Sequence, residues 1–453
     1  MSKFARHHHH PNWVNVFIGI LAGFATMGML PAQTPATGHA VPAAATMSTL
    51  YEFTGGGDGG FPQASVAISS TSGVLYGTTY EGGKYGWGAA YQLTPPVAPS
   101  TTWIEKTIYS FTGGNDGANP SANLLIGPTG VLYGTAYNGG SSGYGVVFSL
   151  VPGTGGVWTE SVLHTFTGGN DGANPAAGLI STKTGVYFGT TYNGGTSGYG
   201  TVFQLVYSGT AWNENILFSF TGGTDGANPT AGLTSAGASG VLYGTTYGGG
   251  TSGLGTVFEL LPPSSSSAPW TEKPLYSFTG GTDGANPQSG IILGKLNVLY
   301  GSAFWAGSST ACLLGGYPAG CGTLFELLPP ATKGGTWTQK VIYTFTGGTD
   351  GAHPYETMSQ ASAGGLYGSA FSGGSGADVC FPASYPGCGA VYALLPPTTQ
   401  GGAWIKSGLH VFMGDDGGGP NGIVLGSNGT LYGTTYNGGA LGGGYGTVFS
   451  LVP

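Results

Sequence analysis

Seven aspartates that recur at one position of a repeated turn are the residues best placed to do chemistry. Each stands in a glycine-rich stretch such as FTGGNDGANP: Asp58, Asp116, Asp171, Asp225, Asp283, Asp350 and Asp416. Calcium normally takes about six to eight oxygen ligands, whereas each stretch offers one recurrent carboxylate and lacks the spacing of a calcium loop. An Asp-Gly turn, in which the carboxylate accepts backbone N–H bonds, explains the same pattern. We predict a structural turn and no metal site, with ligand contact as the alternative.

The position before the proline of this turn changes between copies while its surroundings stay the same. It holds Phe61, Asn119, Asn174, Asn228, Asn286, His353 and Gly419. We expect this position to be exposed, so that Asn119, Asn174, Asn228, Asn286 and His353 would set the selectivity of any binding face. The seventh turn, FMGDDGGGP, is one residue shorter and is expected to differ.

Four cysteines lie in two enlarged loops of the fifth and sixth repeats. They are Cys312, Cys321, Cys380 and Cys388, for which three pairings are possible. Bridges Cys312–Cys321 and Cys380–Cys388 are expected, because each would close a single loop. Both would need an oxidising compartment. The two stapled loops would form a ridge on one sector of the molecule, which is a candidate interaction surface.

Catalytic constellations are scarce. After the N-terminal region the histidines are His164, His353 and His410, and there is no nucleophile elbow, zinc-protease helix or phosphate loop. Paired carboxylates for glycoside hydrolysis would have to come from unlike repeats. The candidates are Asp378, Glu356 and Asp350. The sequence therefore favours a non-enzymatic protein without a cofactor and leaves a hydrolase or lyase as the alternative.

A sevenfold repeat supplies the elements that must position these residues. The pattern YGTTY or a close relative begins at Tyr76, Tyr133, Phe188, Tyr243, Tyr300, Tyr367 and Tyr432. The pattern GTVF or a relative ends at Tyr91, Phe148, Phe203, Phe258, Phe325, Tyr392 and Phe449. In the fourth copy TAGLT, GVLYGTTY, GTVFELL and WTEKPLYSF have the composition of four short strands. The pattern predicts an all-β, seven-bladed β-propeller of four-stranded antiparallel blades, with an open β-solenoid as the competitor.

The two ends of the repeat region predict how the ring closes. Residues Leu50 to Phe53 match only the fourth strand of a unit, and the final GTVFSLVP matches only the third. Pairing these strands completes the seventh blade and removes two exposed sheet edges. Within LYGTTY we expect Tyr243, Thr245 and Tyr247 to belong to the core. The aspartate turns and the loops between second and third strands should share one face, around a central channel.

The first 47 residues differ from the propeller region at 48–453. Lys3 and Arg6 precede four histidines, His7 to His10, and an apolar run from Trp13 to Leu30. This layout is typical of a secretory signal peptide, and an uncleaved membrane anchor is the alternative because about 18 apolar residues can just span a bilayer. The histidines could bind a metal, but we interpret them as an incidental part of the leader.

Composition restricts the partners. Charged residues make up 6% of the chain, against roughly a quarter in ordinary proteins. Ten Lys plus Arg cannot form a phosphate-binding stripe, so nucleic acid is not an expected partner. Membrane contact is expected only if the N-terminal segment is retained. Hydrophobic residues reach 40%, which is enough for a core despite 92 glycines.

The motifs LYGTTYNGG, GYGTVF and FTGGxDGANP at this period resemble the GloVer tandem repeat of secreted bacterial choice-of-anchor proteins. The resemblance covers nearly everything after residue 47 and implies a propeller-forming secreted or surface protein, without known catalytic residues. Similarity to kelch-type propeller repeats is looser. We predict a monomeric, secreted or surface-associated binding module for a carbohydrate or another cell-envelope component. The alternatives are an extracellular hydrolase or lyase with paired carboxylates and a structural envelope protein without a ligand.

Overall fold

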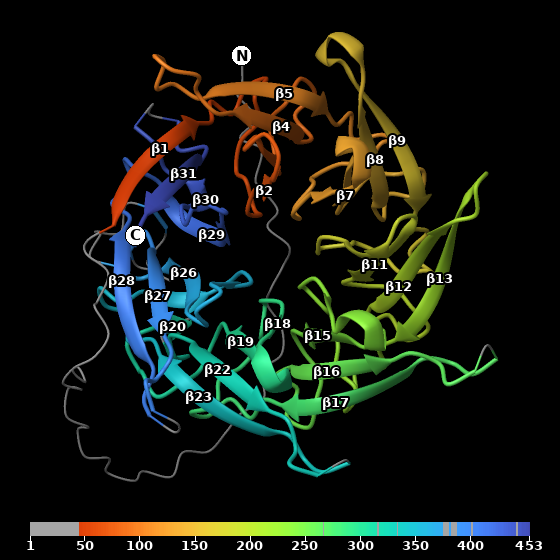
Figure 1. Cartoon of the computed structure of the whole chain (residues 1–453). Helices are drawn as coiled ribbons and strands as arrows, with labels where there is room; N and C mark the ends of the chain where they lie inside the picture. Colours follow the sequence, from red (N-terminus) through yellow and green to blue (C-terminus); the bar gives the residue numbers. More distant parts are fainter. Residues whose placement is uncertain are drawn as a thin grey trace, which may run out of the picture. The chain divides into compact units, whose positions relative to one another are not determined.

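Seven β-sheets stand side by side around a common axis, as Figure 1 shows. The computed structural model describes residues 45–453 except 266, 315–316, 333, 375–379, 382–386, 400–401 and 441–442. These residues belong to one compact unit, His39–Pro453. The predicted seven-bladed β-propeller is confirmed. The expected signal peptide or anchor and the four histidines lie outside the described residues, and no helix of the described part is long and apolar enough to cross a membrane.

Each blade is an antiparallel sheet whose strands follow one another from the axis outward (Figure 1). Blade 1 contains β2 (Ala67–Ile68), β3 (Leu75–Thr79), β4 (Ala89–Thr94) and β5 (Ile104–Ser110), and blade 2 contains β6 (Leu125–Ile126), β7 (Leu132–Ala136), β8 (Val146–Pro152) and β9 (Trp158–Thr165). Blade 3 contains β10 (Ile180–Lys183), β11 (Val186–Thr191), β12 (Thr201–Tyr207) and β13 (Trp212–Ser219), and blade 4 contains β14 (Thr234–Ser235), β15 (Leu242–Thr246), β16 (Thr256–Leu261) and β17 (Thr271–Ser277).

The last three blades differ from this four-stranded arrangement in their loops, inner strand or chain order. Blade 5 contains β18 (Ile292–Leu293), β19 (Leu299–Ala303), β22 (Thr323–Leu328) and β23 (Thr338–Thr344), with the short pair β20 (Leu313–Leu314) and β21 (Tyr317–Pro318) in its enlarged loop. Blade 6 contains β24 (Ala352–Pro354), β25 (Ser359–Gln360), β26 (Leu366–Ser372), β27 (Ala390–Leu395) and β28 (Ile405–Val411), and its inner strand is split because β24 and β25 both pair with β26. Single 3-10 turns occur at η1 (Pro128–Gly130), η2 (Thr154–Gly156), η3 (Gly237–Ser239) and η4 (Lys295–Asn297).

Blade 7 is assembled from both ends of the repeat region, as predicted. It contains β29 (Gly418–Leu425), β30 (Leu431–Asn437), β31 (Thr447–Val452) and β1 (Thr46–Glu52). The antiparallel ladder of β1 and β31 runs from Thr46 opposite Val452 to Glu52 opposite Thr447. Hydrogen bonds between these two strands therefore close the ring and leave neither strand with a free edge at the seam.

A glycine and an aromatic residue on neighbouring strands explain why the YGTTY and GTVF motifs repeat together. Gly244 lies directly opposite Phe258, and a Cβ on Gly244 would lie 2.5 Å from Phe258 Cζ. The Phe258 side chain has no exposed surface. Its ring packs directly on the backbone of Gly244 inside the blade. The same close approach occurs at Gly77–Tyr91, Gly134–Phe148, Gly189–Phe203, Gly301–Phe325, Gly368–Tyr392 and Gly433–Phe449.

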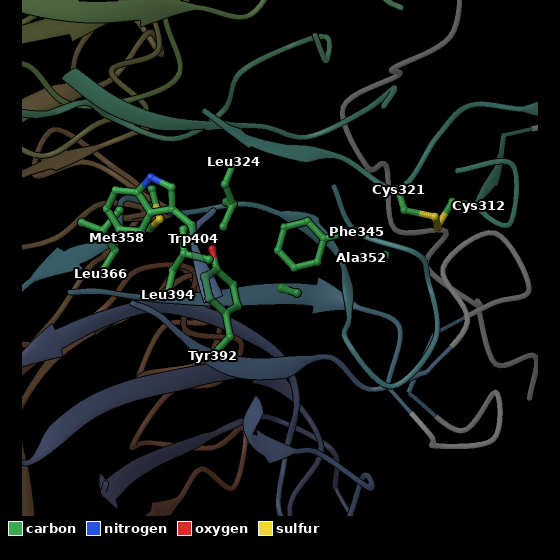
Figure 2. Close-up of a cluster of buried hydrophobic side chains, with 11 residues drawn as sticks. Cys312, Cys321, Leu324, Phe345, Ala352, Met358, Leu366, Tyr392, Leu394 and Trp404 are labelled. Atoms are coloured by element: carbon green, nitrogen blue, oxygen red, sulfur yellow. A yellow bond between two sulfur atoms is a disulfide. The ribbon is translucent and has the colours of Figure 1, made fainter. Parts of the chain in front are cut away.

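Tryptophans join six of the seven blades to the preceding one. The Trp404 ring of blade 6 lies 5.6 Å from the Tyr300 ring of blade 5, and five further tryptophans make equivalent contacts: Trp103, Trp158, Trp212, Trp270 and Trp337. Figure 2 shows the core between blades 5 and 6, with Trp404 at one end and the Cys312–Cys321 bridge at the other. Phe345 and Tyr392 fill the space between these ends.

The inner strands are shorter than the sequence predicted. The stretch TAGLT contributes only Thr234 to the regular strand β14. The residues before it approach the axis, where their carbonyls bond to the neighbouring blade instead of continuing the ladder: Thr190 Oγ1 donates to the Ala231 carbonyl at 3.2 Å. Equivalent bonds join Thr135 to Ala177 and Thr245 to Ser289, at 3.0 and 2.8 Å. These contacts between blades hold the inner segments in place.

Candidate functional site

The aspartate turns and the loops between second and third strands meet on one face, called here the upper face. Gly140, in a loop of blade 2, donates its N–H to the Gly114 carbonyl in the preceding turn at 2.8 Å. Ala118 of that turn forms a β-bridge with Asn138 of the same loop. The predicted arrangement of the two kinds of loop is confirmed.

The turn aspartates are engaged by their own turns. Asp283 accepts hydrogen bonds from the Thr279 N–H at 2.8 Å, the Thr279 hydroxyl at 2.7 Å and the Tyr276 hydroxyl at 2.9 Å. The pair of bonds from the threonine four residues earlier also holds Asp58, Asp116, Asp171, Asp225 and Asp350. Each carboxylate is half-buried. This geometry supports the structural-turn interpretation, and ligand contact stays a prediction.

The shortened seventh turn differs, as expected. Asp416 accepts a hydrogen bond from the Met413 N–H at 2.8 Å, and its other oxygen lies 2.7 Å from His410 Nε2. The hydrogen bond with His410 and the bond from the Met413 backbone lower the pKa of Asp416, against the opposing effect of its burial. A histidine thus replaces the tyrosine that serves several of the other turns.

The expectation of exposure at the variable position is wrong for its five candidate binding residues. Asn119 and His353 are buried, whereas Asn174, Asn228 and Asn286 are half-buried. Asn119 has a positive φ of 55°, which Asn tolerates better than most residues. Its Nδ2 donates to the Tyr80 carbonyl of the preceding blade at 2.9 Å. Because the same bond recurs at the other three asparagines, these side chains act as clips between blades, and a binding role for them stays a prediction.

His353 takes the clip position in blade 6. Its Nδ1 lies 2.6 Å from the Ser372 hydroxyl, and its ring lies 4.9 Å from the Phe304 ring and 4.5 Å from the Trp305 ring. Burial lowers the pKa of His353 to about 3, so the side chain is neutral at physiological pH. It packs as an aromatic residue in the upper part of the boundary between blades 5 and 6.

Both predicted disulfides are present and confirm the local pairing. Cys312 is bonded to Cys321 and Cys380 to Cys388, each pair with its Cα atoms 5.2 Å apart. Each bridge therefore closes one loop of the upper face, in adjacent blades 5 and 6.

The first bridge takes the place that an aromatic residue holds in other blades. In blade 1 the half-exposed Trp87 covers Gly113 of the next turn so closely that a Cβ on Gly113 would lie 2.5 Å from the indole. In blade 5 a Cβ on Gly347 would lie 2.9 Å from the Sγ atoms of Cys312 and Cys321. The disulfide thus replaces a stacked ring at the boundary between two blades.

Half-buried glutamates of the outer strands face the aspartates of the turns that precede their blades. One carboxyl oxygen of Glu214 is buried and has no hydrogen-bond partner among the described residues. Burial, and to a smaller degree the charge of Asp171, raises the pKa of Glu214 to about 8. Glu105, Glu160 and Glu272 show raised pKa values for the same causes, with Asp58, Asp116 and Asp225 as the neighbouring charges. No group of three or more metal-binding side chains occurs in the described part of the chain.

These glutamates should make stability fall as the pH rises. Glu214 is protonated in both states below its unfolded pKa, near 4.5. Between that value and about 8 the unfolded chain releases the proton while the folded chain keeps it, which favours unfolding. We therefore expect Glu214→Gln to stabilise the protein by about 1 kcal/mol above pH 8 and to have little effect near pH 4, a discounted value because the side chain keeps some solvent access.

The reciprocal change offers a matched control. Gln339 of blade 5 stands where blades 1 to 4 have the glutamate, and its Nε2 donates to the Asp283 carbonyl at 3.3 Å. Gln339→Glu should lower stability at pH 8 and not at pH 4. Thermal unfolding of both variants from pH 4 to 9 measures the effect, and two parallel pH profiles would contradict it.

A ring of seven aromatic side chains surrounds the axis at the upper ends of the second strands. Its members are Tyr80, Tyr137, Tyr192, Tyr247, Phe304, Phe371 and Tyr436. Beyond the larger effect of burial, neighbouring tyrosines lie close enough for one of each pair to raise the pKa of the other, from Tyr436 through Tyr80, Tyr137 and Tyr192 to Tyr247. Tyr247 also has a hydrogen bond with Trp305, beside Phe304, and the rings of Phe371 and Tyr436 lie 6.3 Å apart. The predicted core position of Tyr247 is wrong, since its side chain is only half-buried.

Tyr355 lies inside this ring. Its side chain is 6.1 Å from Phe304 and 5.9 Å from Phe371, measured between ring centroids. Tyr436, Tyr137 and Tyr80 lie close enough to contribute to the raised pKa of the Tyr355 phenol, after the larger effect of burial. Burial is the main cause of the raised pKa of Tyr355 and raises the pKa of Tyr137 to about 12. The phenols therefore stay protonated at physiological pH and can both donate and accept hydrogen bonds.

The surroundings of the ring are neutral to acidic. Glu356 lies on the inner wall, where a Cβ on Gly422 of blade 7 would lie 3.0 Å from the Glu356 Cβ. Burial raises the pKa of Glu356 to about 7, and Glu81 is close enough to Tyr436 to raise the pKa of that phenol, after the larger effect of burial. Apart from Lys84, the described lysines lie in outer strands or beside the hairpins of the opposite face.

The three acids that the sequence offered for hydrolysis do not form a visible pair. Asp350 is held in its turn by the Thr346 N–H and the Tyr343 hydroxyl, both at 2.9 Å. Glu356 lies on the inner wall of blade 6, and Asp378 lies outside the described residues. Sequence reasoning missed the ring and Tyr355. Tyr355 could have been noticed in the sequence, because it follows the proline of its turn at a position where other repeats have smaller residues. These are Gln63, Ser121, Ala176, Thr230 and Gln288.

Comparison with known proteins gives one family and several distant structures. A family model of the Gloeobacter/Verrucomicrobia repeat matches residues 34–258 and 106–314, which together span more than half of the chain. No curated protein matches.

Three solved structures match over long stretches at low identity. A gluconolactonase from Xanthomonas campestris is 12% identical, with 73% of this chain and 84% of that chain covered and a TM-score of 0.39. A hypothetical selenium-binding protein from Sulfolobus tokodaii is 9% identical, with coverage of 74% and 76% and a TM-score of 0.49. A sialidase from Trypanosoma rangeli is 10% identical, with coverage of 91% and 59% and a TM-score of 0.42.

Proposed function

This chain belongs to the Gloeobacter/Verrucomicrobia repeat family, and on that premise we propose that it is a propeller that binds an uncharged carbohydrate through the aromatic ring of its upper face. The observation that carries the proposal is the circle of seven aromatic side chains with Tyr355 inside it, packed between Phe304 and Phe371.

Sugar rings suit such a surface because they combine apolar C–H faces with hydroxyl groups. Aromatic side chains present large rigid apolar faces, and tyrosines add a polar hydroxyl. Tyr80, Tyr137 and Tyr436 are half-buried, so each is held by the protein while keeping surface for a ligand. A few polar groups among apolar ones are the usual composition of a small-molecule site.

The charged residues around the ring favour an uncharged ligand over an acidic one. Glu81 and Glu356 are the carboxyl groups described near the ring, and Lys84 is the one described lysine in an upper-face loop. The Lys84 Nζ lies 5.1 Å from the centre of the Tyr85 ring, away from the axis. A polyuronate or a sulfated glycan would therefore meet repulsion without a compensating cation.

An extracellular location is part of the proposal. The two disulfides support it, because such bonds persist in oxidising compartments. The ligand would then be a glycan of the cell envelope or of the surroundings.

A glycan array followed by calorimetry with the purified full chain tests the proposal. We expect retention of neutral oligosaccharides and not of polyuronates. Tyr355→Ala should weaken the affinity about tenfold or more, because it removes the aromatic face inside the circle. Tyr207→Ala is the control, since Tyr207 is 48% exposed at the end of β12 on the opposite face. Absence of any retained glycan, or equal binding by the Tyr355 variant, would refute the proposal.

A further inference from the structure

The stapled loop of blade 6 places a further aromatic ring beside the circle. Phe381 follows Cys380, which is bonded to Cys388. Its ring lies 4.7 Å from Phe371 and 6.4 Å from Tyr436, with a stacked orientation toward Tyr436 at an interplanar angle of 26°. Phe381 is thus added to the circle where blades 6 and 7 meet.

The seventh aspartate turn has a glycine, Gly419, at the position against which Phe381 packs. Gly419 stands at the clip position that holds Asn119, Asn174 and Asn228 in other blades, with a similar φ of 62°. A Cβ on Gly419 would lie 2.5 Å from Phe381 Cζ and also within 3 Å of the Phe371 ring. An asparagine at 419 would therefore displace Phe381, so the absence of the clip and the presence of the added ring belong together.

The disulfide fixes the backbone from which Phe381 projects. A Cβ on Gly418 would lie 2.6 Å from Cys380 Sγ, so the sulfur rests directly on the first residue of β29. The Cys380 carbonyl accepts a hydrogen bond from Asn437 Nδ2 at 2.6 Å. Cys380 is therefore held from two sides by blade 7, and its neighbour Phe381 has a defined place.

We infer that Phe381 is a ligand-contacting wall of the site and that the Cys380–Cys388 bridge positions it. This inference rests on the proposed function and makes it more specific. A sugar ring bound beside Tyr355 would meet Phe381 and Tyr436 on the side of blades 6 and 7, so the sevenfold circle has one preferred sector. The ligand class is then a glycan with an accessible apolar face on a terminal or neighbouring sugar.

The other bridge provides a contrast within the same molecule. Cys312 and Cys321 are part of the buried core between blades 5 and 6, beside Phe345 (Figure 2). Their sulfurs cover Gly347 of the next turn. Loss of this bridge should affect stability more than ligand binding.

Calorimetric titration of the full chain with the best neutral oligosaccharide tests the inference. Phe381→Leu keeps apolar volume in contact with Gly419 but removes the flat face, and we expect about tenfold weaker binding at nearly unchanged melting temperature. Phe381→Tyr should restore most of the affinity. Gly419→Asn should weaken binding to the same extent by displacing the ring.

The disulfide is tested with paired substitutions. Cys380→Ala/Cys388→Ala should weaken binding several-fold, and Cys312→Ala/Cys321→Ala should leave the dissociation constant within about twofold while lowering the melting temperature. Native-like affinity of the Phe381→Leu and Gly419→Asn variants would overturn the inference and leave the proposed function standing. If the native chain binds no glycan, the proposed function and the inference about Phe381 fail together. If only Tyr355→Ala weakens the affinity, Phe381 does not contact the ligand.

Discussion

A chain without residues 46–53 is expected to melt at least about 10 °C lower than one that begins at Ala45, and to associate in solution. The deletion removes the complete outer strand β1 of blade 7, whose partners on β31 run from Thr447 to Val452. It also removes Phe53, which is 2% exposed and packs 5.0 Å from the Tyr91 ring of blade 1. Burial of one such ring is worth about 3–5 kcal/mol, and the ladder adds to it.

The unpaired edge of β31 gives the expected association. An open edge presents N–H and C=O groups to any other strand, including the same edge of a second copy. Scanning calorimetry and light scattering measure the two effects. A synthetic peptide of residues 45–54 should restore the melting temperature when it is added in excess. Equal melting of the two chains would show that the seam contributes little.

Phe258→Ala is expected to cost about 3–5 kcal/mol of unfolding free energy, because it empties a fully buried site at the centre of blade 4. Gly244→Ala should also destabilise, since its new methyl group would meet Phe258 Cζ at 2.5 Å. If the two positions are coupled as the structure shows, Gly244→Ala combined with Phe258→Leu should cost less than the sum of the single changes.

Tyr91→Phe is the control for this pair. Tyr91 occupies the position of Phe258 in blade 1, and its hydroxyl is buried without a hydrogen-bond partner among the described residues. Removing that hydroxyl should stabilise the protein by about 1 kcal/mol. Denaturant unfolding of the five chains measures all the values. Strict additivity at Gly244 and Phe258 would contradict the proposed contact.

Features that depend on nearby residues or on repetition could be predicted from the sequence. Asp283 and Thr279 are four residues apart, so the turn could be inferred from the glycine-rich stretch alone. The glycine at Gly244 and an aromatic residue at the position of Phe258 recur in every unit, because each blade buries such a pair. Repetition therefore predicted the number of blades, their strands and the closing seam.

Features that depend on distant partners or occur once could not be predicted in this way. The exposure of Asn119 was misjudged because its partner is the Tyr80 carbonyl, 39 residues earlier in another blade. Alternation along LYGTTY placed Tyr247 on a buried side but could not show that the strand ends at the upper face. Tyr355 and Phe381 each belong to a single repeat, so a search for residues that recur in every copy passed over them.

The seam between β1 and β31 also determines how the ring would respond to mechanical load. Thr46 pairs with Val452, so both ends of the propeller leave from the same end of one antiparallel ladder. A pull on the two ends would open this ladder one pair at a time, as a zipper opens, and would not shear all its bonds together. Tension along the chain would therefore release the outer strand of blade 7 at low force, before the other six blades carry any load.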